Sequence, residues 1–197
     1  MNYDIEKLAK EASKVLSGGG VIVYPTETVY GLGGNATDEL TVRKIFKIKG
    51  REEGKPLIIL VKDFVMAGQI GDLGLYRGVL EKYWPGALTG IFKSRSKLPA
   101  GIVSKEGTVA LRISPHPFVQ KLFEFIDFPL ISTSANRSGD KNSLSVTAVK
   151  NSLGENFNLI GYVIDLGELP SSLPSTLVDF TSTQPRILRQ GSISFPL

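Results

Sequence analysis

Residues 21–34 read Val-Ile-Val-Tyr-Pro-Thr-Glu-Thr-Val-Tyr-Gly-Leu-Gly-Gly, and this stretch establishes the pattern of the chain. The apolar run 21–24 predicts a short buried strand. Pro25 predicts the end of that strand, because proline has no N–H to donate to a ladder. The polar, glycine-rich residues 26–34 predict a loop at the strand end. The side chains of this loop could bind a small polar ligand, or its hydroxyls could simply cap the turn.

Predicted helices and strands alternate along the remaining sequence. Helices are expected at 5–16, 38–48, 75–83, 118–125 and 146–153, and strands at 57–61, 88–92, 109–113, 130–131, 162–164, 177–180 and 187–188. Such interleaving favours an α/β fold around one mixed sheet. No linker or internal repeat divides the sequence, so a single domain over 1–197 is expected.

The composition excludes several kinds of chemistry. The 197 residues include no cysteine, which removes disulfides, thiolate zinc sites and cysteine nucleophiles. The single histidine, His116, lies between two prolines and has no evident nucleophile beside it, which argues against a Ser/His/Asp triad. A zinc site would have to be built mainly from carboxylates. No metal held by the protein itself is therefore predicted.

Charge and hydropathy say less about function. A net charge of +4 favours anionic ligands such as nucleotides or RNA, but an ordinary solvated surface explains it equally well. No apolar run reaches the ~20 residues that a membrane-spanning helix needs, and none near the start fits a signal peptide. We expect a cytoplasmic protein without a membrane partner.

Two further polar segments follow predicted elements. Lys49-Gly50-Arg51 lies at the end of a predicted helix, where cations are favoured by the dipole, but the pair could also clamp a phosphate or carboxylate. The segment 132–139 carries several hydroxyls and an amide after a short strand. It could cradle phosphates, or it could be a serine-rich turn. No Walker A motif is present.

Two positions inside apolar segments need a separate explanation. Arg112 interrupts an apolar strand, and burying a guanidinium is costly unless it is paired. We therefore expect a partner or an anionic ligand for it. Trp84, the only tryptophan, precedes Pro85-Gly86 and is interpreted as a packed corner.

Taken together and in this order, the motifs resemble those of the YrdC-like family of threonylcarbamoyl-AMP synthases. The resemblance extends from about residue 18 to residue 191. It rests on 25–33, Lys49-x-Arg51, Pro56-Leu57, Trp84-Pro85-Gly86, Arg112 with His116-Pro117, 132–136, Pro174-Ser175-Thr176 and Arg189-x-Gly191.

The resemblance implies an α/β fold with a twisted, mostly covered sheet around a large, concave, basic cavity. It also implies that L-threonine, ATP and bicarbonate or CO2 react to give threonylcarbamoyl-AMP and pyrophosphate. Mg2+ would arrive with the nucleotide. A separate transferase would then pass the threonylcarbamoyl group to tRNA.

The resemblance also assigns roles to individual residues, and none of them is a covalent nucleophile. Lys49 and Arg51 would be catalytic, stabilising the triphosphate and the developing carbamate charge. ATP would be bound by Lys49, Arg51, Thr133, Ser134, Asn136 and Arg189. Threonine would be bound by Thr28, Arg51, Arg112 and Ser175.

Three positions depart from the family pattern. Ala87 replaces a proline in Trp-Pro-Gly-Pro-Leu-Thr, Leu60 stands where many members have a histidine, and residues 141–144 replace Pro-Ser-Pro-Thr. In that last segment Asn142 or Ser143 could substitute for the missing serine. The long-form C-terminal domain is also missing, so the short form is expected.

The sequence is compatible with two alternatives. One is a module that binds double-stranded RNA or tRNA without catalysis, and the charge allows weak RNA binding of this kind. Against it, the sequence has no Lys/Arg cluster or aromatic ladder. The other is a relative that uses carbamoyl phosphate, but those chains are far longer and carry zinc-finger cysteines.

Overall fold

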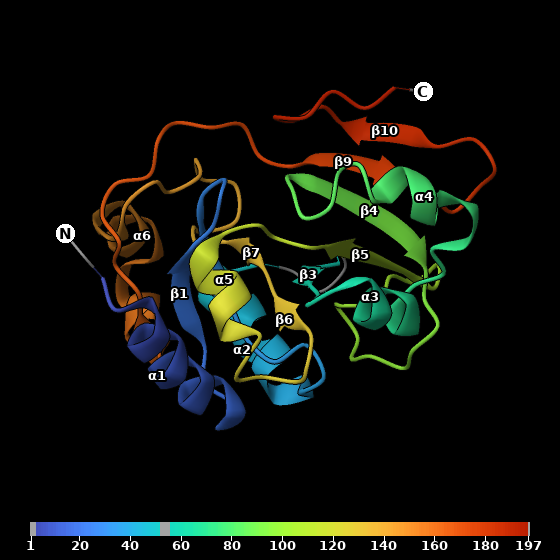
Figure 1. Ribbon diagram of the computed structural model, residues 1–197. Helices are drawn as coiled ribbons and strands as arrows, with labels where there is room; N and C mark the ends of the chain where they lie inside the picture. The colour runs from blue at the N-terminus through green and yellow to red at the C-terminus, as the bar shows by residue number, and fades with distance from the viewer. Residues whose placement is uncertain (1–2, 52–55, 197) are drawn as a thin grey trace.

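The computed structural model describes residues 3–51 and 56–196 of the predicted domain 1–197 (Figure 1). The helices are α1 (Ile5–Ser17), α2 (Glu39–Lys49), α3 (Phe64–Ile70), α4 (Arg77–Leu80), α5 (Pro117–Leu122) and α6 (Val146–Leu153), with 3-10 turns η1 (Gly74–Tyr76) and η2 (Gly154–Leu159). The strands are β1 (Ile22–Pro25), β2 (Tyr30–Gly33), β3 (Ile58–Leu60), β4 (Leu88–Lys93), β5 (Thr108–Arg112), β6 (Leu130–Ile131), β7 (Thr133–Ser134), β8 (Tyr162–Val163), β9 (Thr176–Asp179) and β10 (Arg186–Arg189).

The α/β class is confirmed, but the strands form two mixed sheets and not the one predicted. The smaller sheet has the order β7-β2-β1-β8 and the larger one β10-β9-β4-β5-β3-β6. The segment 130–134 joins them: β6 pairs with β3 in the larger sheet, and β7 pairs with β2 in the smaller one. Between them, the Ser132 N–H still donates to Ile58 O at 2.8 Å. A crossing this short leaves no signal in hydrophobic periodicity.

Within the predicted loop 26–34, residues 30–33 form the strand β2. Residues 30–33 pair antiparallel with β1, from Ile22 opposite Gly33 to Pro25 opposite Tyr30. Gly33 serves packing, because a Cβ there would lie 2.8 Å from the ring of Tyr24. The turn itself is only 26–29, where the Thr26 hydroxyl accepts from the N–H groups of Thr28 and Val29. Gly31 and Gly33, which contributed to the loop prediction, leave room for the ring of Tyr24.

The helices follow the sequence pattern more closely. Asp38 caps α2 by accepting from Leu40 N at 3.0 Å, and Gly50 ends it in the left-handed conformation with φ 55°. The bounds of α6 were predicted correctly. The predicted helix 75–83 is instead η1 followed by the four-residue α4. Helix α3 was missed, because its seven residues bury only Ala67 and Ile70 and give little periodicity.

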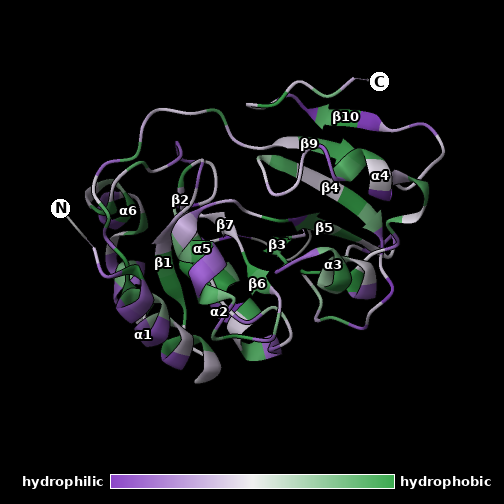
Figure 2. Cartoon of the chain, in the orientation of Figure 1, coloured by the Kyte–Doolittle hydropathy of each residue, from purple (hydrophilic) through white to green (hydrophobic). Residues whose placement is uncertain are grey.

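A helical layer covers the smaller sheet. Helix α1 packs on α5, and the two enclose Ile22 and Tyr24 of β1 in one apolar cluster. Figure 2 shows α1 in alternating purple and green and β1 mostly green, as expected for an amphipathic helix that covers a buried strand. Within the described ranges no helix has the length and apolar character needed to cross a bilayer.

Candidate active site

A cavity of about 390 Å³ lies where the two sheets meet. The smaller sheet and its turns contribute the side with Thr28, Thr133 and Ser134, and the larger sheet contributes Arg112 from β5 and Arg189 from β10. Seven of the nine predicted site residues line this cavity: Thr28, Arg51, Arg112, Thr133, Ser134, Ser175 and Arg189. The fold thus brings together motifs that are separated by more than a hundred residues in the sequence.

The cavity wall is cationic. Arg51, Arg112 and Arg189 line it, and the lining residues that the structure describes include no carboxylate. Burial lowers the pKa of Arg51. Burial, and then the nearby charge of Arg112, lower the pKa of Arg189. Arg112 and Arg189 are therefore close enough to repel each other, and an anionic ligand would relieve that repulsion.

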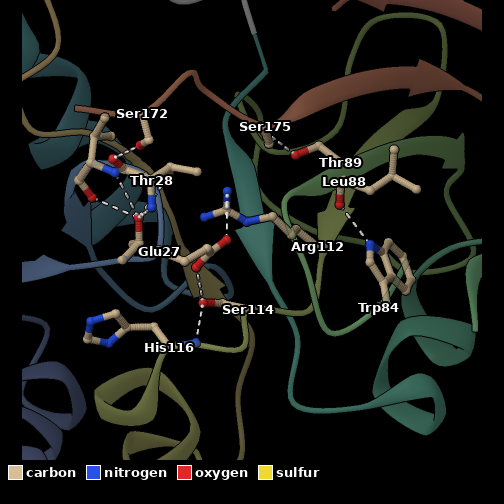
Figure 3. Close-up of polar contacts among 12 residues, drawn as sticks. Glu27, Thr28, Trp84, Leu88, Thr89, Arg112, Ser114, His116, Ser172 and Ser175 are labelled. Carbon is tan, nitrogen blue, oxygen red and sulfur yellow. Dashed lines mark hydrogen bonds and ion pairs between the residues drawn. The ribbon is translucent and has the colours of Figure 1, made fainter. Parts of the chain in front are cut away.

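Arg112 has the partner that its burial required. The Arg112 residue is 5% exposed, and its Nη1 lies 3.4 Å from Glu27 Oε1. The other carboxylate oxygen of Glu27 accepts from the Ser114 hydroxyl at 2.5 Å, as Figure 3 shows. Arg112 Nε is buried without a hydrogen-bond partner among the described residues. The guanidinium is thus charge-paired through Nη1, and its buried Nε donates to no group among the described residues.

Lys49 lies behind the cavity wall and not on it. Its side chain is almost fully buried, and Nζ donates to Ser134 O at 2.5 Å and to Asn136 O at 2.8 Å. Asn136 is also buried, and its Nδ2 donates to Arg137 O and Asp140 O. Lys49 and Asn136 therefore fix the segment 134–140 through hydrogen bonds to its carbonyls, on the side away from the cavity. Thr133 and Ser134 of β7 then line the cavity.

The environment of Lys49 predicts a pH dependence of stability. Burial, and then the charge of Arg51, lower the pKa of Lys49 from its usual 10.5 to about 7. Between these values the unfolded chain keeps a proton that the folded chain has lost, so the free energy of unfolding should rise with pH. Relative to Lys49→Met, the wild type should gain about 1–3 kcal/mol between pH 7 and pH 10 in urea unfolding. Parallel curves for the two proteins would contradict this.

The C-terminal motifs support the far side of the cavity. Arg189 Nη2 and Nε donate to Ser175 O at 2.9 Å and 3.2 Å, and the Ser175 hydroxyl lies 2.8 Å from Thr89 Oγ1. Gly191 passes directly over this turn, and its N–H donates to Thr176 Oγ1 at 3.0 Å. The motifs Pro174-Ser175-Thr176 and Arg189-x-Gly191 are therefore one packed unit.

Gly191 should not tolerate a side chain. A Cβ there would lie 2.1 Å from Pro174 O and 2.5 Å from the backbone of Ser175. We expect Gly191→Ala to lower the free energy of unfolding by about 1–3 kcal/mol, the usual cost of overpacking. The control is Gly68→Ala inside α3, where a Cβ meets nothing within 4 Å. That change should stabilise the protein by about 0.5–1 kcal/mol. Equal effects in urea unfolding would disprove the packing argument.

The structure also decides positions that the sequence left open. Asn142 lines the cavity, whereas Ser143 is buried and its carbonyl accepts from Tyr30 N, so only Asn142 can replace the missing loop serine. The Trp84 indole donates to Leu88 O at 2.7 Å inside the core, which confirms a packed corner. His116 Nδ1 accepts from Phe118 N and caps α5, so this nitrogen is already engaged.

The donor set bears on metal binding. Within the residues that the structure describes, no group of three His, Asp or Glu side chains could hold a metal ion. The cavity instead offers arginines, hydroxyls and an amide, which suit phosphate and carboxylate oxygens. Such a site fits a metal that arrives already bound to a phosphate chain.

The fold and the cavity define the class: an α/β protein with a cationic, hydroxyl-rich cavity between two sheets, suited to small anionic ligands. The chain belongs to the Sua5/YciO/YrdC family, whose model, described as "Telomere recombination", matches residues 14–191. The YrdC-like resemblance drawn from the motifs is thus confirmed.

Similar proteins carry the name threonylcarbamoyl-AMP synthase. One from Pyrococcus abyssi is 36% identical over 179 residues, covering 89% of this chain and 51% of that protein. One from Vibrio vulnificus strain YJ016 is 35% identical over 186 residues, covering 92% of this chain and 97% of that protein. The structure of P. abyssi Sua5 complexed with L-threonine superposes with a TM-score of 0.87 at 33% identity, covering 97% of this chain and 56% of that one. This chain spans about half the length of the P. abyssi protein and nearly all of the Vibrio one.

Proposed function

We propose that this chain is a threonylcarbamoyl-AMP synthase, which forms threonylcarbamoyl-AMP and pyrophosphate from L-threonine, ATP and bicarbonate or CO2. The observation that carries the proposal is the cavity between the sheets, where three arginines meet the hydroxyls of the predicted motifs. Family membership and the similarity to a synthase of nearly equal length support it. The P. abyssi structure with L-threonine supports an amino-acid ligand.

The two substrates would occupy adjoining parts of the cavity, because Arg189 on the nucleotide side donates to Ser175 on the threonine side. ATP would bind along Arg51, the β7 hydroxyls of Thr133 and Ser134, and Arg189, with Lys49 and Asn136 fixing the β7 loop. Threonine would bind near Thr28, Arg112 and Ser175, with Arg51 between the two ligands. Asn142 is added to the nucleotide side, because it lines the cavity where the family loop departs from its pattern.

The proposed reaction needs positioning and charge stabilisation and no covalent nucleophile. The amine of threonine attacks CO2 and loses a proton to give the carbamate. A carbamate oxygen then attacks the α-phosphorus of ATP, the bond to the β-phosphate oxygen breaks, and pyrophosphate leaves. Guanidinium groups held at fixed positions stabilise the negative charge that grows on the oxygens around phosphorus. Mg2+ supplied with the nucleotide would neutralise part of the same charge.

The wider role is part of the proposal. A separate transferase would consume the adenylate and modify tRNA, and the protein would work in the cytoplasm. Any direct RNA binding would be weak and would rest on the net charge alone.

Pyrophosphate release tests the proposal. With ATP and bicarbonate, release should depend on L-threonine, and the nucleotide product should have the mass of threonylcarbamoyl-AMP. ATP binding without pyrophosphate release under any amino acid would contradict the proposal and favour the RNA-binding alternative. That alternative predicts an RNA affinity that falls steeply with salt.

A further inference from the structure

We propose that Glu27 is a positioning residue whose fixed charge keeps polyphosphate away from Arg112 and reserves the surroundings of that guanidinium for a zwitterionic amino acid. The inference rests on the proposed function, because it concerns how the two substrates of that reaction share one cavity.

The three arginines of the cavity would bind triphosphate as well as the carboxylate of an amino acid, so the site needs a means of selectivity. A cavity with three guanidinium groups attracts a triphosphate along its whole length, because each phosphate oxygen can pair with an arginine. Phosphate bound at Arg112 would block threonine. The environment of Arg112 must therefore differ from that of the other arginines, and shape alone discriminates poorly against a flexible phosphate chain.

The two arginines on the larger sheet differ in their partners. Arg189 pairs with no carboxylate among the described residues, and it donates to a neutral carbonyl, Ser175 O. Arg112 lies 3.4 Å from Glu27 Oε1, and both side chains are shielded, at 6% and 18% exposed. Shielded charges interact more strongly than surface charges, so Glu27 offsets part of the field of Arg112.

The carboxylate is itself held in place. Ser114 donates to Glu27 Oε2 at 2.5 Å, and the same hydroxyl accepts from His116 N at 3.2 Å. Gln120 of α5 donates to Ser114 O, which fixes the segment that carries the hydroxyl. In Figure 3 the chain of contacts runs from Arg112 through Glu27 to Ser114. The negative charge thus has a fixed position beneath the guanidinium and not a mobile one.

The charge of the ligand decides how strongly Glu27 acts on it. Threonine is a zwitterion, so a fixed negative charge repels its carboxylate, attracts its ammonium group and changes its affinity little. A triphosphate has no positive end, and every one of its charges is repelled. Glu27 therefore discriminates between the two anionic groups without contacting either, an electrostatic form of specificity.

Calorimetric titration with L-threonine and with inorganic triphosphate tests the inference. In the wild type, triphosphate should bind without displacing threonine. In Glu27→Gln, which keeps the shape of the side chain but loses its charge, triphosphate should bind about tenfold more tightly and should compete with threonine. In Glu27→Asp, which retains the charge, triphosphate should still bind without displacing threonine.

Two more variants separate the effect of the charge of Glu27 from the effect of the hydrogen bond that positions it. Ser114→Ala keeps the charge but removes its hydrogen bond, so threonine affinity should change little and triphosphate should still fail to compete. The control is Glu124→Gln, an exposed carboxylate paired with Lys121 on the surface, which should change neither titration. Circular dichroism checks that each variant is folded.

Each outcome bears on the proposal. Unchanged triphosphate binding in a folded Glu27→Gln would overturn it. Competition between triphosphate and threonine in the wild type would overturn it as well, and this measurement needs no variant. The triphosphate titration does not depend on threonine. A wild type that binds no threonine would therefore remove the proposed function while still testing the charge of Glu27.

Discussion

Lys49→Met should lower kcat/KM for threonine-dependent pyrophosphate release by about 10²–10³-fold, the range seen when a pre-positioned donor is lost. The reason is indirect, because Lys49 does not line the cavity. Its Nζ donates to Ser134 O and Asn136 O and so fixes the position of β7 relative to the cavity. Without it, Thr133 and Ser134 can shift, and a displacement near 1 Å can cost about 10²-fold.

The expected stability change is smaller than the change in activity. Methionine fills a similar volume but leaves two carbonyls without their donor, at about 1–3 kcal/mol. Part of this is offset, because the buried charge disappears. The matched control is Lys47→Met, an exposed lysine two residues earlier on α2. Rates measured well below the unfolding transition should separate the two variants, and near-normal turnover of Lys49→Met would contradict the role assigned to it.

Much of the fold could be predicted, because helices and longer strands leave periodic patterns. The α2 cap at Asp38, the Gly50 stop and the bounds of α6 are local features that a sequence records. The strand nature of 30–33 could not be predicted, since Gly31 and Gly33 are there for the ring of Tyr24, a contact across the hairpin. The split into two sheets was also hidden, because it depends on one residue, Ser132, between two short pairings.

The candidate site divides in the same way. The polar side chains that follow strands predicted the residues that reach the cavity. The arginine in an apolar strand predicted a partner or an anionic ligand. The identity of that partner could not be predicted from the sequence, because Glu27 and Arg112 are 85 positions apart and come into contact only where the two sheets adjoin. Nor could spacing show that Lys49 points at the back of the β7 loop, since Lys49-x-Arg51 places two cations on one helix end whichever way each side chain turns.

Arg112→Gln should raise the KM for L-threonine by about 100-fold or more while changing the KM for ATP by less than about threefold, because a buried charge pair with a ligand contributes about 2–5 kcal/mol. The residue is almost fully buried at the cavity wall, and its Nε has no hydrogen-bond partner within the described residues. A carboxylate is the ligand group that a guanidinium in this state pairs with most strongly. Initial-rate kinetics with each substrate varied in turn would measure the two KM values.

The single change also leaves Glu27 shielded and without its cation, so some loss of stability is expected from an unpaired carboxylate. The double variant Glu27→Gln with Arg112→Gln removes both charges and should regain stability, yet it should bind threonine no better than Arg112→Gln alone. The control is Arg186→Gln, which breaks an exposed pair with Asp179 on the same sheet and should leave both KM values unchanged. If the double variant recovered threonine affinity, Arg112 would serve only to neutralise Glu27, and the carboxylate of the substrate would have to bind elsewhere in the cavity.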